Sequence, residues 1–177
     1  MKRLILAGLL SGVCALPAQA QTVILVRHAE KADPAAGLDA DPALSEAGQA
    51  RARALAAALG DADLTHVVVS PLQRTRLTAA VAAEAAAVSP EAVSLDGGVE
   101  AHVARIAARI HALPEDAVVL VVGHSNTVPL IARALGQTDA ADMQDCEYDR
   151  LTVLDLDGGE TRGEVSRYGP PSACDPA

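Results

Sequence analysis

The segment that most constrains the fold is the run from Ala117 to Val122, in which every residue after Ala117 is valine or leucine. A strand with one solvent-facing side would carry polar residues at alternate positions, and this run carries none. Such continuous apolar runs are typical of parallel strands that helices cover on both faces. The chain therefore needs two layers of helices around a mostly parallel sheet.

Apolar runs and helix signals alternate along the rest of the chain. Strands are expected at Thr22–Val26 and His66–Val69, and between them Ser45 can cap an alanine-rich helix that ends at Leu59, before Gly60. The other predicted elements are a helix from Pro71 to about Ala87, a short strand over 92–95, a helix over 99–113 and a helix from Ser125 through Leu135.

The C-terminal part predicts a hairpin. Leu151–Leu156 and Glu164–Tyr168 flank Asp157-Gly158-Gly159, a sequence typical of a tight turn. This hairpin would add an antiparallel edge strand. The fold class expected is α/β, a three-layer α/β/α sandwich around a mostly parallel sheet with an antiparallel edge strand.

The first residues have the pattern of a secretory signal. Lys2 and Arg3 precede the apolar segment Leu4–Leu16, and small residues flank Gln19 as signal peptidase requires. The alternative, a membrane anchor, would need roughly 20 apolar residues. We expect residues 1–20 to be a signal peptide and residues 21–177 a single exported domain, periplasmic or secreted, without stable membrane insertion after cleavage.

The charge of the chain restricts its partners. The formal net charge is −9, and loss of Lys2 and Arg3 with the signal would leave 12 basic and 23 acidic residues, about −11. This balance argues against nucleic acid as a partner. An acidic protein that binds an anion must concentrate its few cations at one place.

Two cysteines remain after the signal, Cys146 and Cys174. In an oxidising compartment they could form a disulfide that ties the C-terminal tail to the domain, and two free thiols are the alternative. Their spacing does not match a zinc or redox motif, which favours a structural role.

Charged side chains follow three of the predicted strands. Arg27 and His28 end the first strand, Ser70 and Arg74 follow the second, and His124 follows the run that ends at Val122. Ligands of parallel sheets bind at the carboxyl ends of the strands. The planar guanidinium group of arginine can donate paired hydrogen bonds to phosphate oxygens, and a histidine with a free ring nitrogen can attack phosphorus. The pattern predicts a phosphate pocket with a histidine nucleophile.

Three segments carry a family likeness: Leu25–Glu30, Ser70–Thr75 and Val122–Ser125. They resemble the signature segments of the histidine phosphatase superfamily, also called phosphoglycerate mutase-like, and the chain is most similar to its compact phosphatase branch. The resemblance implies that His28 becomes phosphorylated, that Arg27 and Arg74 hold the phosphate, and that His124 completes the pocket. It also implies the α/β/α sandwich and a reaction without metal or other cofactor.

The chain departs from the family at one position and leaves one role open. Ala29 stands where the family usually has glycine, and a Cβ there is expected to tighten the pocket floor. Many relatives carry an acid that protonates the leaving group, and Glu30, Asp96 and Glu100 are the candidates here. Without such an acid, phosphoramidates, anhydrides and aryl phosphates would be favoured.

The function expected is an exported, metal-independent phosphatase acting on a small phosphomonoester or phosphoramidate through a phosphohistidine on His28. The alternative is a non-catalytic phosphate-binding or interaction module, although binding alone would not need His28. A metal-dependent hydrolase would need clustered ligands, which the sequence does not show. We interpret His66, His102 and His111 as structural or surface residues.

Overall fold

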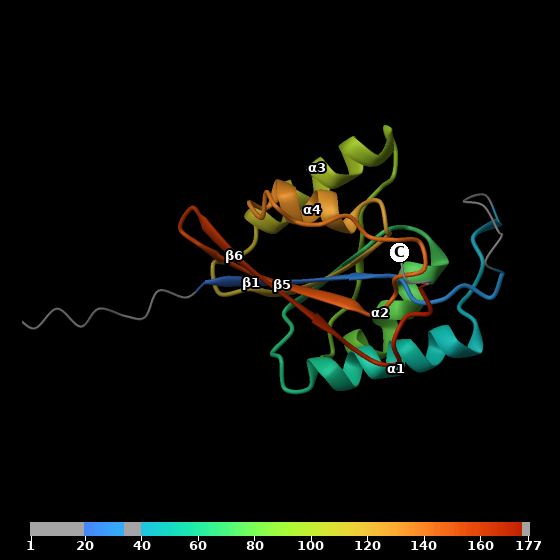
Figure 1. Ribbon diagram of the computed structural model, residues 1–177. Helices are drawn as coiled ribbons and strands as arrows, with labels where there is room; N and C mark the ends of the chain where they lie inside the picture. Colours follow the sequence, from blue (N-terminus) through green and yellow to red (C-terminus); the bar gives the residue numbers. More distant parts are fainter. Residues whose placement is uncertain (1–19, 34–39, 175–177) are drawn as a thin grey trace, which may run out of the picture.

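A computed structural model describes residues 20–33 and 40–174 of the chain. Nearly all of the predicted signal peptide, 1–20, and half of the predicted loop, 31–42, therefore lie outside the described residues. A sheet runs through the middle of the molecule between two layers of helices (Figure 1). No helix in the part described is long and apolar enough to cross a membrane.

The sheet contains six strands in the order β3-β2-β4-β1-β5-β6. The strands are β1 (Gln21–Arg27), β2 (His66–Val69), β3 (Glu91–Ala92), β4 (Val118–Gly123), β5 (Arg150–Asp157) and β6 (Glu160–Arg167). As the sequence predicted, β4 lies inside the sheet, parallel to both β1 and β2, and Val119, Leu120 and Val121 are fully buried.

The order of the strands explains the two helical layers. From β1 to β2 to β3 the chain moves toward one edge, and from β3 to β4 it returns. Right-handed crossovers in opposite directions put their helices on opposite faces. Accordingly α1 (Glu46–Leu59) and α2 (Gln73–Ala85) cover one face, and α3 (Gly98–His111) and α4 (Val128–Ala134) cover the other (Figure 1).

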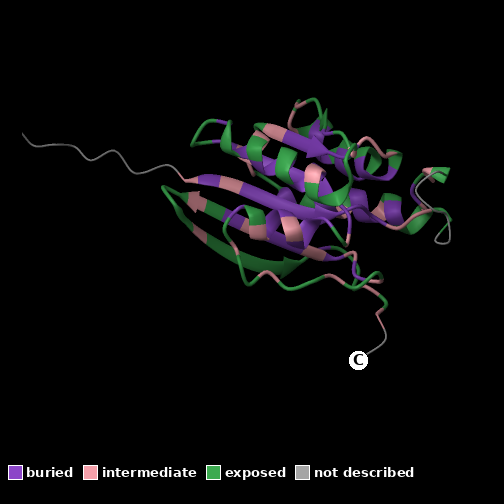
Figure 2. Cartoon of the chain, turned by 90° about the horizontal axis from the view of Figure 1, so that it is seen from above, coloured by how far each residue is buried: buried purple, intermediate pink, exposed green. Residues whose placement is uncertain are grey.

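Alternate residues of the inner strands pack into two separate cores. In β1, Val23 and Leu25 pack on the side of α3 and α4, whereas Ile24 and Val26 pack on the side of α1 and α2. Figure 2 shows the inner strands as buried and the outer hairpin as largely exposed, in agreement with the exposed pattern of β6. The three-layer prediction is confirmed.

The C-terminal hairpin gives two antiparallel strands rather than one. β5 pairs antiparallel with β1, and β6 pairs antiparallel with β5. The short strand β3 lies slightly earlier than predicted, and α2 ends at Ala85 rather than at Ala87.

The predicted helix start at Ser125 is wrong. Residues 125–127 form a turn in which the backbone N–H groups of Thr127 and Val128 both donate to the carbonyl of His124, and α4 begins at Val128. The turn requires glycine at position 123, because a Cβ there would lie too close to the turn, 2.8 Å from Thr127 Oγ1 and 3.0 Å from Val128 Cγ2. The amides of Thr127 and Val128 are thus engaged within this turn.

The first turn of α1 packs directly on the chain after β1. Ser45 caps the helix as predicted, its Oγ accepting from the N–H of Gly48 at 3.0 Å. A Cβ on Gly48 would overlap the backbone carbonyl oxygen of Glu30, two residues beyond His28. Close approach of these two backbones therefore requires glycine at this position.

Replacement of Gly48 should destabilise the protein although it lies in a helix. Gly→Ala inside a helix is normally favourable by up to about 1 kcal/mol. Here we expect Gly48→Ala to lower the free energy of unfolding by about 1–3 kcal/mol, since the new methyl group must displace backbone. Urea unfolding measures this, with the exposed Ala57→Gly of the same helix as the control for propensity alone. An unfolding free energy at or above that of the unaltered protein would contradict the close approach.

Candidate active site

The register of β1 against β4 brings the two predicted histidines together. Arg27 lies opposite Gly123 in the parallel pairing, so His28 and His124 each follow at the same level of the sheet. The backbone N–H of His28 donates to the Gly123 carbonyl at 2.9 Å, and the two imidazole ring centres are 5.3 Å apart. Two residues far apart in sequence thus share one crevice at the carboxyl edge.

One nitrogen of His28 is committed and the other is available. Nδ1 lies 2.8 Å from the carbonyl oxygen of Ala29, which can only accept, so Nδ1 carries the proton and Nε2 the lone pair. Burial, together with the charges of Arg27 and Arg74, lowers the pKa of His28 to about 3. The imidazole is therefore neutral at pH 7, the form in which Nε2 is a nucleophile.

His124 is held by the polar residue that follows β2. Its Nε2 lies 3.0 Å from Ser70 Oγ, which in turn lies 3.0 Å from Thr75 Oγ1. Burial, followed by the neighbouring His28, lowers the pKa of His124 to about 3. Both histidines are consequently neutral, and the arginines supply the positive charge of the site.

Arg27 is anchored along one side only. Its Nη1 donates to the carbonyls of three residues of one loop, Gln144 at 3.3 Å, Asp145 at 2.5 Å and Glu147 at 3.3 Å. The ring of Tyr148 lies 4.0 Å from the guanidinium carbon. Nε is buried without a hydrogen-bond partner among the described residues, so this donor is left unsatisfied.

Arg74, in the first turn of α2, is still less engaged. Its Nε and Nη1 are buried and have no hydrogen-bond partner in the part of the chain described. The nearest carboxylate is that of Asp41, 3.6 Å from Nη1, which also accepts hydrogen bonds from the N–H of Gln73 at 2.8 and 2.9 Å. Sequence reasoning missed Asp41, because nothing distinguishes it from the other acids of its loop.

These side chains open into a cavity of about 470 Å³. It is lined by Arg27, His28, Lys31, Leu72, Arg74, Leu95, Gly98, Val99, His124, Ser125, Asn126, Thr127, Asp145 and Tyr148. A slightly larger hollow of about 540 Å³ lies at the opposite end of the strands, beside the turn of the hairpin. No lysine or arginine is among the described residues that line it, so the smaller cavity is the candidate anion site.

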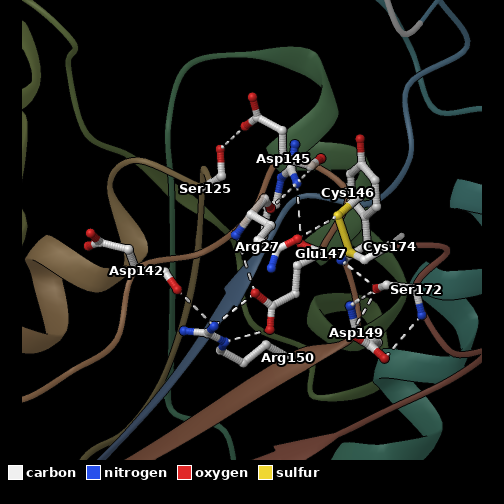
Figure 3. Close-up of a disulfide and its surroundings, with 12 residues drawn as sticks. Arg27, Ser125, Asp142, Asp145, Cys146, Glu147, Asp149, Arg150, Ser172 and Cys174 are labelled. Atoms are coloured by element: carbon white, nitrogen blue, oxygen red, sulfur yellow. Dashed lines mark hydrogen bonds and ion pairs between the residues drawn. A yellow bond between two sulfur atoms is a disulfide. The ribbon is translucent and has the colours of Figure 1, made fainter. Parts of the chain in front are cut away.

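The three acids proposed from sequence do not line this cavity. Glu30 forms an ion pair with Arg51 at 2.7 Å, and Asp96 accepts a hydrogen bond from Ser94. The carboxylate that does line it, alone among the described residues, is Asp145, whose Oδ1 accepts from Ser125 Oγ at 2.8 Å (Figure 3). Its position before a cysteine in a loop offered no sequence signal.

Ala29 does not tighten the pocket floor as expected. It is fully buried, packs with Leu44 and Ala52, and is not part of the cavity wall. Its backbone is not among the described positions with positive φ, so a residue with a Cβ is accommodated without strain.

The other polar groups that sequence singled out lie away from the cavity wall. His102 is buried with its Nδ1 3.0 Å from the carbonyl of Ser94, and neither His66 nor His111 lines the cavity. No cluster of three metal-ligating side chains occurs within residues 20–33 and 40–174. Cys146 and Cys174 form a disulfide.

Comparison with known proteins places this geometry in a family context. Residues 23–96 match the family described as histidine phosphatase superfamily (branch 1). A protein from Nakamurella multipartitia assigned as the phosphohistidine phosphatase SixA is 30% identical, with a TM-score of 0.59 and coverage of 89% of this chain and 99% of that one. No curated protein sequence gives a significant match.

Two further solved structures share the fold. A protein from Agrobacterium tumefaciens, also assigned as SixA, is 24% identical with a TM-score of 0.60, covering 86% of this chain and 99% of its own. The mycobacterial glucosyl-3-phosphoglycerate phosphatase Rv2419c is 18% identical with a TM-score of 0.61, covering 86% and 100%. These matches extend over most of the chain rather than over the signature segments alone.

Burial of two neutral histidines predicts a loss of stability in acid. Below about pH 6.5 the unfolded chain binds protons on His28 and His124 that the folded protein binds only near pH 3. Stability should therefore fall as the pH drops from 6.5, by up to about 1.4 kcal/mol per pH unit for each histidine. Urea unfolding at pH 7.5, 6.0 and 4.5 should show a flatter dependence for the His28→Asn/His124→Asn variant. Parallel curves for the two proteins would contradict neutral histidines.

Proposed function

The chain belongs to the histidine phosphatase superfamily and is a phosphatase, and from this premise we propose an exported, metal-independent enzyme that forms a phosphohistidine on His28. The observation that carries the proposal is the state of His28. Its Nδ1 is fixed on the Ala29 carbonyl, so Nε2 carries the lone pair. The same cavity is lined by Arg27 and Arg74, each of which has buried donors without a partner among the described residues.

The proposed reaction has two steps. The open sides of Arg27 and Arg74 hold the non-bridging oxygens of the substrate while His28 Nε2 attacks phosphorus. A P–N bond forms, the bond to the leaving group breaks, and the leaving group takes the electron pair. Water then attacks the phosphohistidine, the P–N bond breaks, and inorganic phosphate leaves with His28 restored to its neutral form. His124 would hydrogen-bond the phosphoryl group during both transfers.

The substrate proposed is a small phosphomonoester or phosphoramidate with a good leaving group. A cavity of about 470 Å³ suits a small molecule, and Asp145 is the only carboxylate among its described lining residues. Because the described lining offers few acids, the preferred substrate is one whose leaving group departs without protonation by a strong general acid. Dephosphorylation of a phosphohistidine, the activity for which the SixA relatives are named, belongs to the same chemical class.

Export is proposed from two independent features. The first is the signal-like segment at residues 1–20. The second is the disulfide between Cys146 and Cys174, since disulfides persist in oxidising compartments. In such a compartment a small-molecule or envelope-associated phosphate ester is the proposed substrate.

Loss of His28 should abolish turnover while phosphate binding persists. With 4-nitrophenyl phosphate and a chelator present, we expect the protein from Gln21 onward to be active and His28→Ala to lose at least about 10³-fold in kcat. Rapid acid-free quenching of the active protein with radiolabelled substrate should reveal an alkali-stable, acid-labile phosphoprotein that His28→Ala does not form.

The matched control is His111→Ala, which removes an exposed histidine at the end of α3 and should retain full activity. Chelator-sensitive turnover would oppose the metal-free mechanism. A folded protein that binds phosphate without turnover would instead support the non-catalytic module.

The rate should depend steeply on the leaving group. Because general acids contribute about 10²–10⁴-fold, kcat/KM should fall by at least about 10²-fold from 4-nitrophenyl phosphate to a simple alkyl phosphate. The Asp145→Asn variant should keep this ratio unchanged. A selective loss of alkyl phosphate hydrolysis in Asp145→Asn would show that Asp145 is the proton donor, and similar rates for both substrates would contradict the proposed substrate class.

A further inference from the structure

The loop that anchors Arg27 is fastened to the C-terminal tail. We call residues 144–147 the anchoring loop, because Arg27 Nη1 donates to three of its four carbonyls. The remaining residue of the loop, Cys146, is joined by the disulfide to Cys174, 28 residues later (Figure 3). A covalent bond thus acts on the segment that orients the phosphate-binding arginine.

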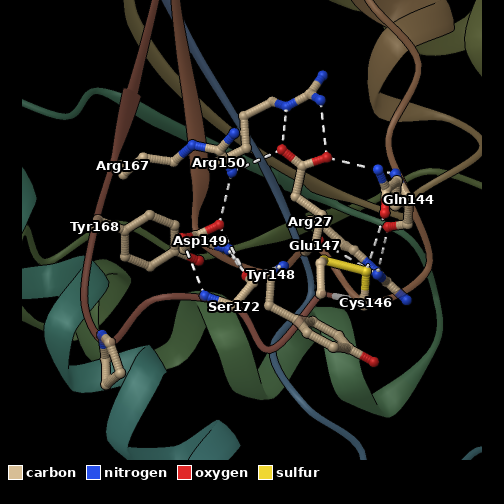
Figure 4. A network of polar contacts seen from close by, with 12 residues as sticks. Arg27, Gln144, Cys146, Glu147, Tyr148, Asp149, Arg150, Arg167, Tyr168 and Ser172 are labelled. Carbon is tan, nitrogen blue, oxygen red and sulfur yellow. Dashed lines mark hydrogen bonds and ion pairs between the residues drawn. A yellow bond between two sulfur atoms is a disulfide. The ribbon is translucent and has the colours of Figure 1, made fainter. Parts of the chain in front are cut away.

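The tail segment 169–174, which we call the strap, follows β6 and lies against the end of the anchoring loop. Ser172 Oγ accepts from the N–H groups of Tyr148 at 2.7 Å and Asp149 at 3.0 Å. Ser172 also donates to the buried Asp149 carboxylate, from N at 3.1 Å and from Oγ at 2.8 Å (Figure 4). Tyr148 is the residue whose ring packs against Arg27, so the strap supports both the loop and the ring.

The start of the strap is held independently of the disulfide. Arg51 Nη1 donates to the carbonyls of Tyr168 at 3.3 Å and Pro170 at 2.9 Å. Beyond Pro170, the hydrogen bonds of Ser172 and the disulfide to Cys146 hold the described part of the strap. Loss of the disulfide would therefore release the end of the strap without detaching its base.

The far end of the anchoring loop has its own attachment. The buried Glu147 carboxylate binds Arg150 at 2.8 Å and Arg167 at 2.7 Å (Figure 4). Burial would raise the pKa of Glu147, yet the hydrogen bonds and charge of the two arginines hold it below its usual value. Glu147 thus stays fixed to β5 and β6, and it is hydrogen-bonded to Gln144, while Asp145 accepts from Ser125. Cys146 adds the covalent bond that joins this loop to the strap.

We propose that the Cys146–Cys174 disulfide is a redox-sensitive positioning element of the phosphate site. When it is closed, the anchoring loop directs the unpartnered side of Arg27 toward the phosphate. When a dithiol reduces it, the S–S bond breaks, Cys146 and Cys174 become thiols, and the dithiol is oxidised to its own disulfide. The anchoring loop then loses its covalent restraint and keeps only hydrogen bonds, so its carbonyls hold Arg27 less firmly and phosphate binds more weakly. This inference rests on the proposed function only in taking phosphate as the ligand of the site.

The test compares oxidised and reduced protein from Gln21 onward, in which Cys146 and Cys174 are the only cysteines. Calorimetry gives the Kd of inorganic phosphate, and hydrolysis of 4-nitrophenyl phosphate gives KM and kcat. Reduction with dithiothreitol should raise Kd and KM by about tenfold, the scale of one charge-assisted hydrogen bond, and change kcat by less than about twofold. Reoxidation should restore both values.

The Cys146→Ser/Cys174→Ser variant separates the disulfide from other effects of reductant. It should show the Kd of the reduced protein with and without dithiothreitol. Leu59→Ala serves as a matched control for stability, since it truncates a core residue at the end of α1 remote from the loop. It should lower Tm and leave Kd unchanged.

The outcomes distinguish failure of this inference from failure of the proposed function. If reduction lowers Tm while the Kd of phosphate stays constant, the disulfide is only structural and the inference is overturned. Free thiols in the oxidised protein would overturn it as well. A protein that binds phosphate but does not hydrolyse the probe would defeat the proposed function alone, because the Kd measurement still decides the inference. Absence of phosphate binding would overturn both.

Discussion

The parallel pairing of β1 with β4 is the interaction on which the site depends. It places Arg27 opposite Gly123, so the backbones themselves bring His28 and His124 together. The pairing is secure because both strands are buried on two faces, and a shift of one residue would exchange their cores. Side chains then need only short-range restraints, from Ala29 for His28 and from Ser70 for His124. Precision at the site is therefore a consequence of sheet register rather than of a long chain of polar contacts.

The positive charges of the site lie on side chains that folding has already removed from water. Arg27 and Arg74 are nearly buried in a chain whose net charge is negative, and both histidines that line the same cavity are neutral. Each arginine is stabilised from one side, Arg27 by loop carbonyls and Arg74 by Asp41, while other donors have no partner in the part of the chain described. Buried unpaired donors are costly in an empty protein. Under the proposed function, a phosphate that accepts hydrogen bonds from them would offset this cost.

Several expectations from the sequence failed for a common reason. The segment after Gly123 was expected to be helical from Ser125, but its turn is set by hydrogen bonds that converge on the His124 carbonyl. Closeness to His28 in the chain makes Glu30 a candidate proton donor, yet its side chain pairs with Arg51 of α1. Proximity in sequence does not determine the direction in which a side chain points. The contacts of neighbouring elements do, and those elements come from distant parts of the chain.

The layers of the fold and the burial of β4 follow from the sequence alone, because strand and helix periodicity are local properties. The sequence also identifies four residues that line the cavity, Arg27, His28, Arg74 and His124, because parallel strands have their carboxyl ends on one side of the sheet. Tertiary structure decided what surrounds them. Asp41, Asp145 and Tyr148 lie in loops without periodicity, and the disulfide joins two such segments. Their positions depend on long-range packing of the strap and the anchoring loop, which no local pattern encodes.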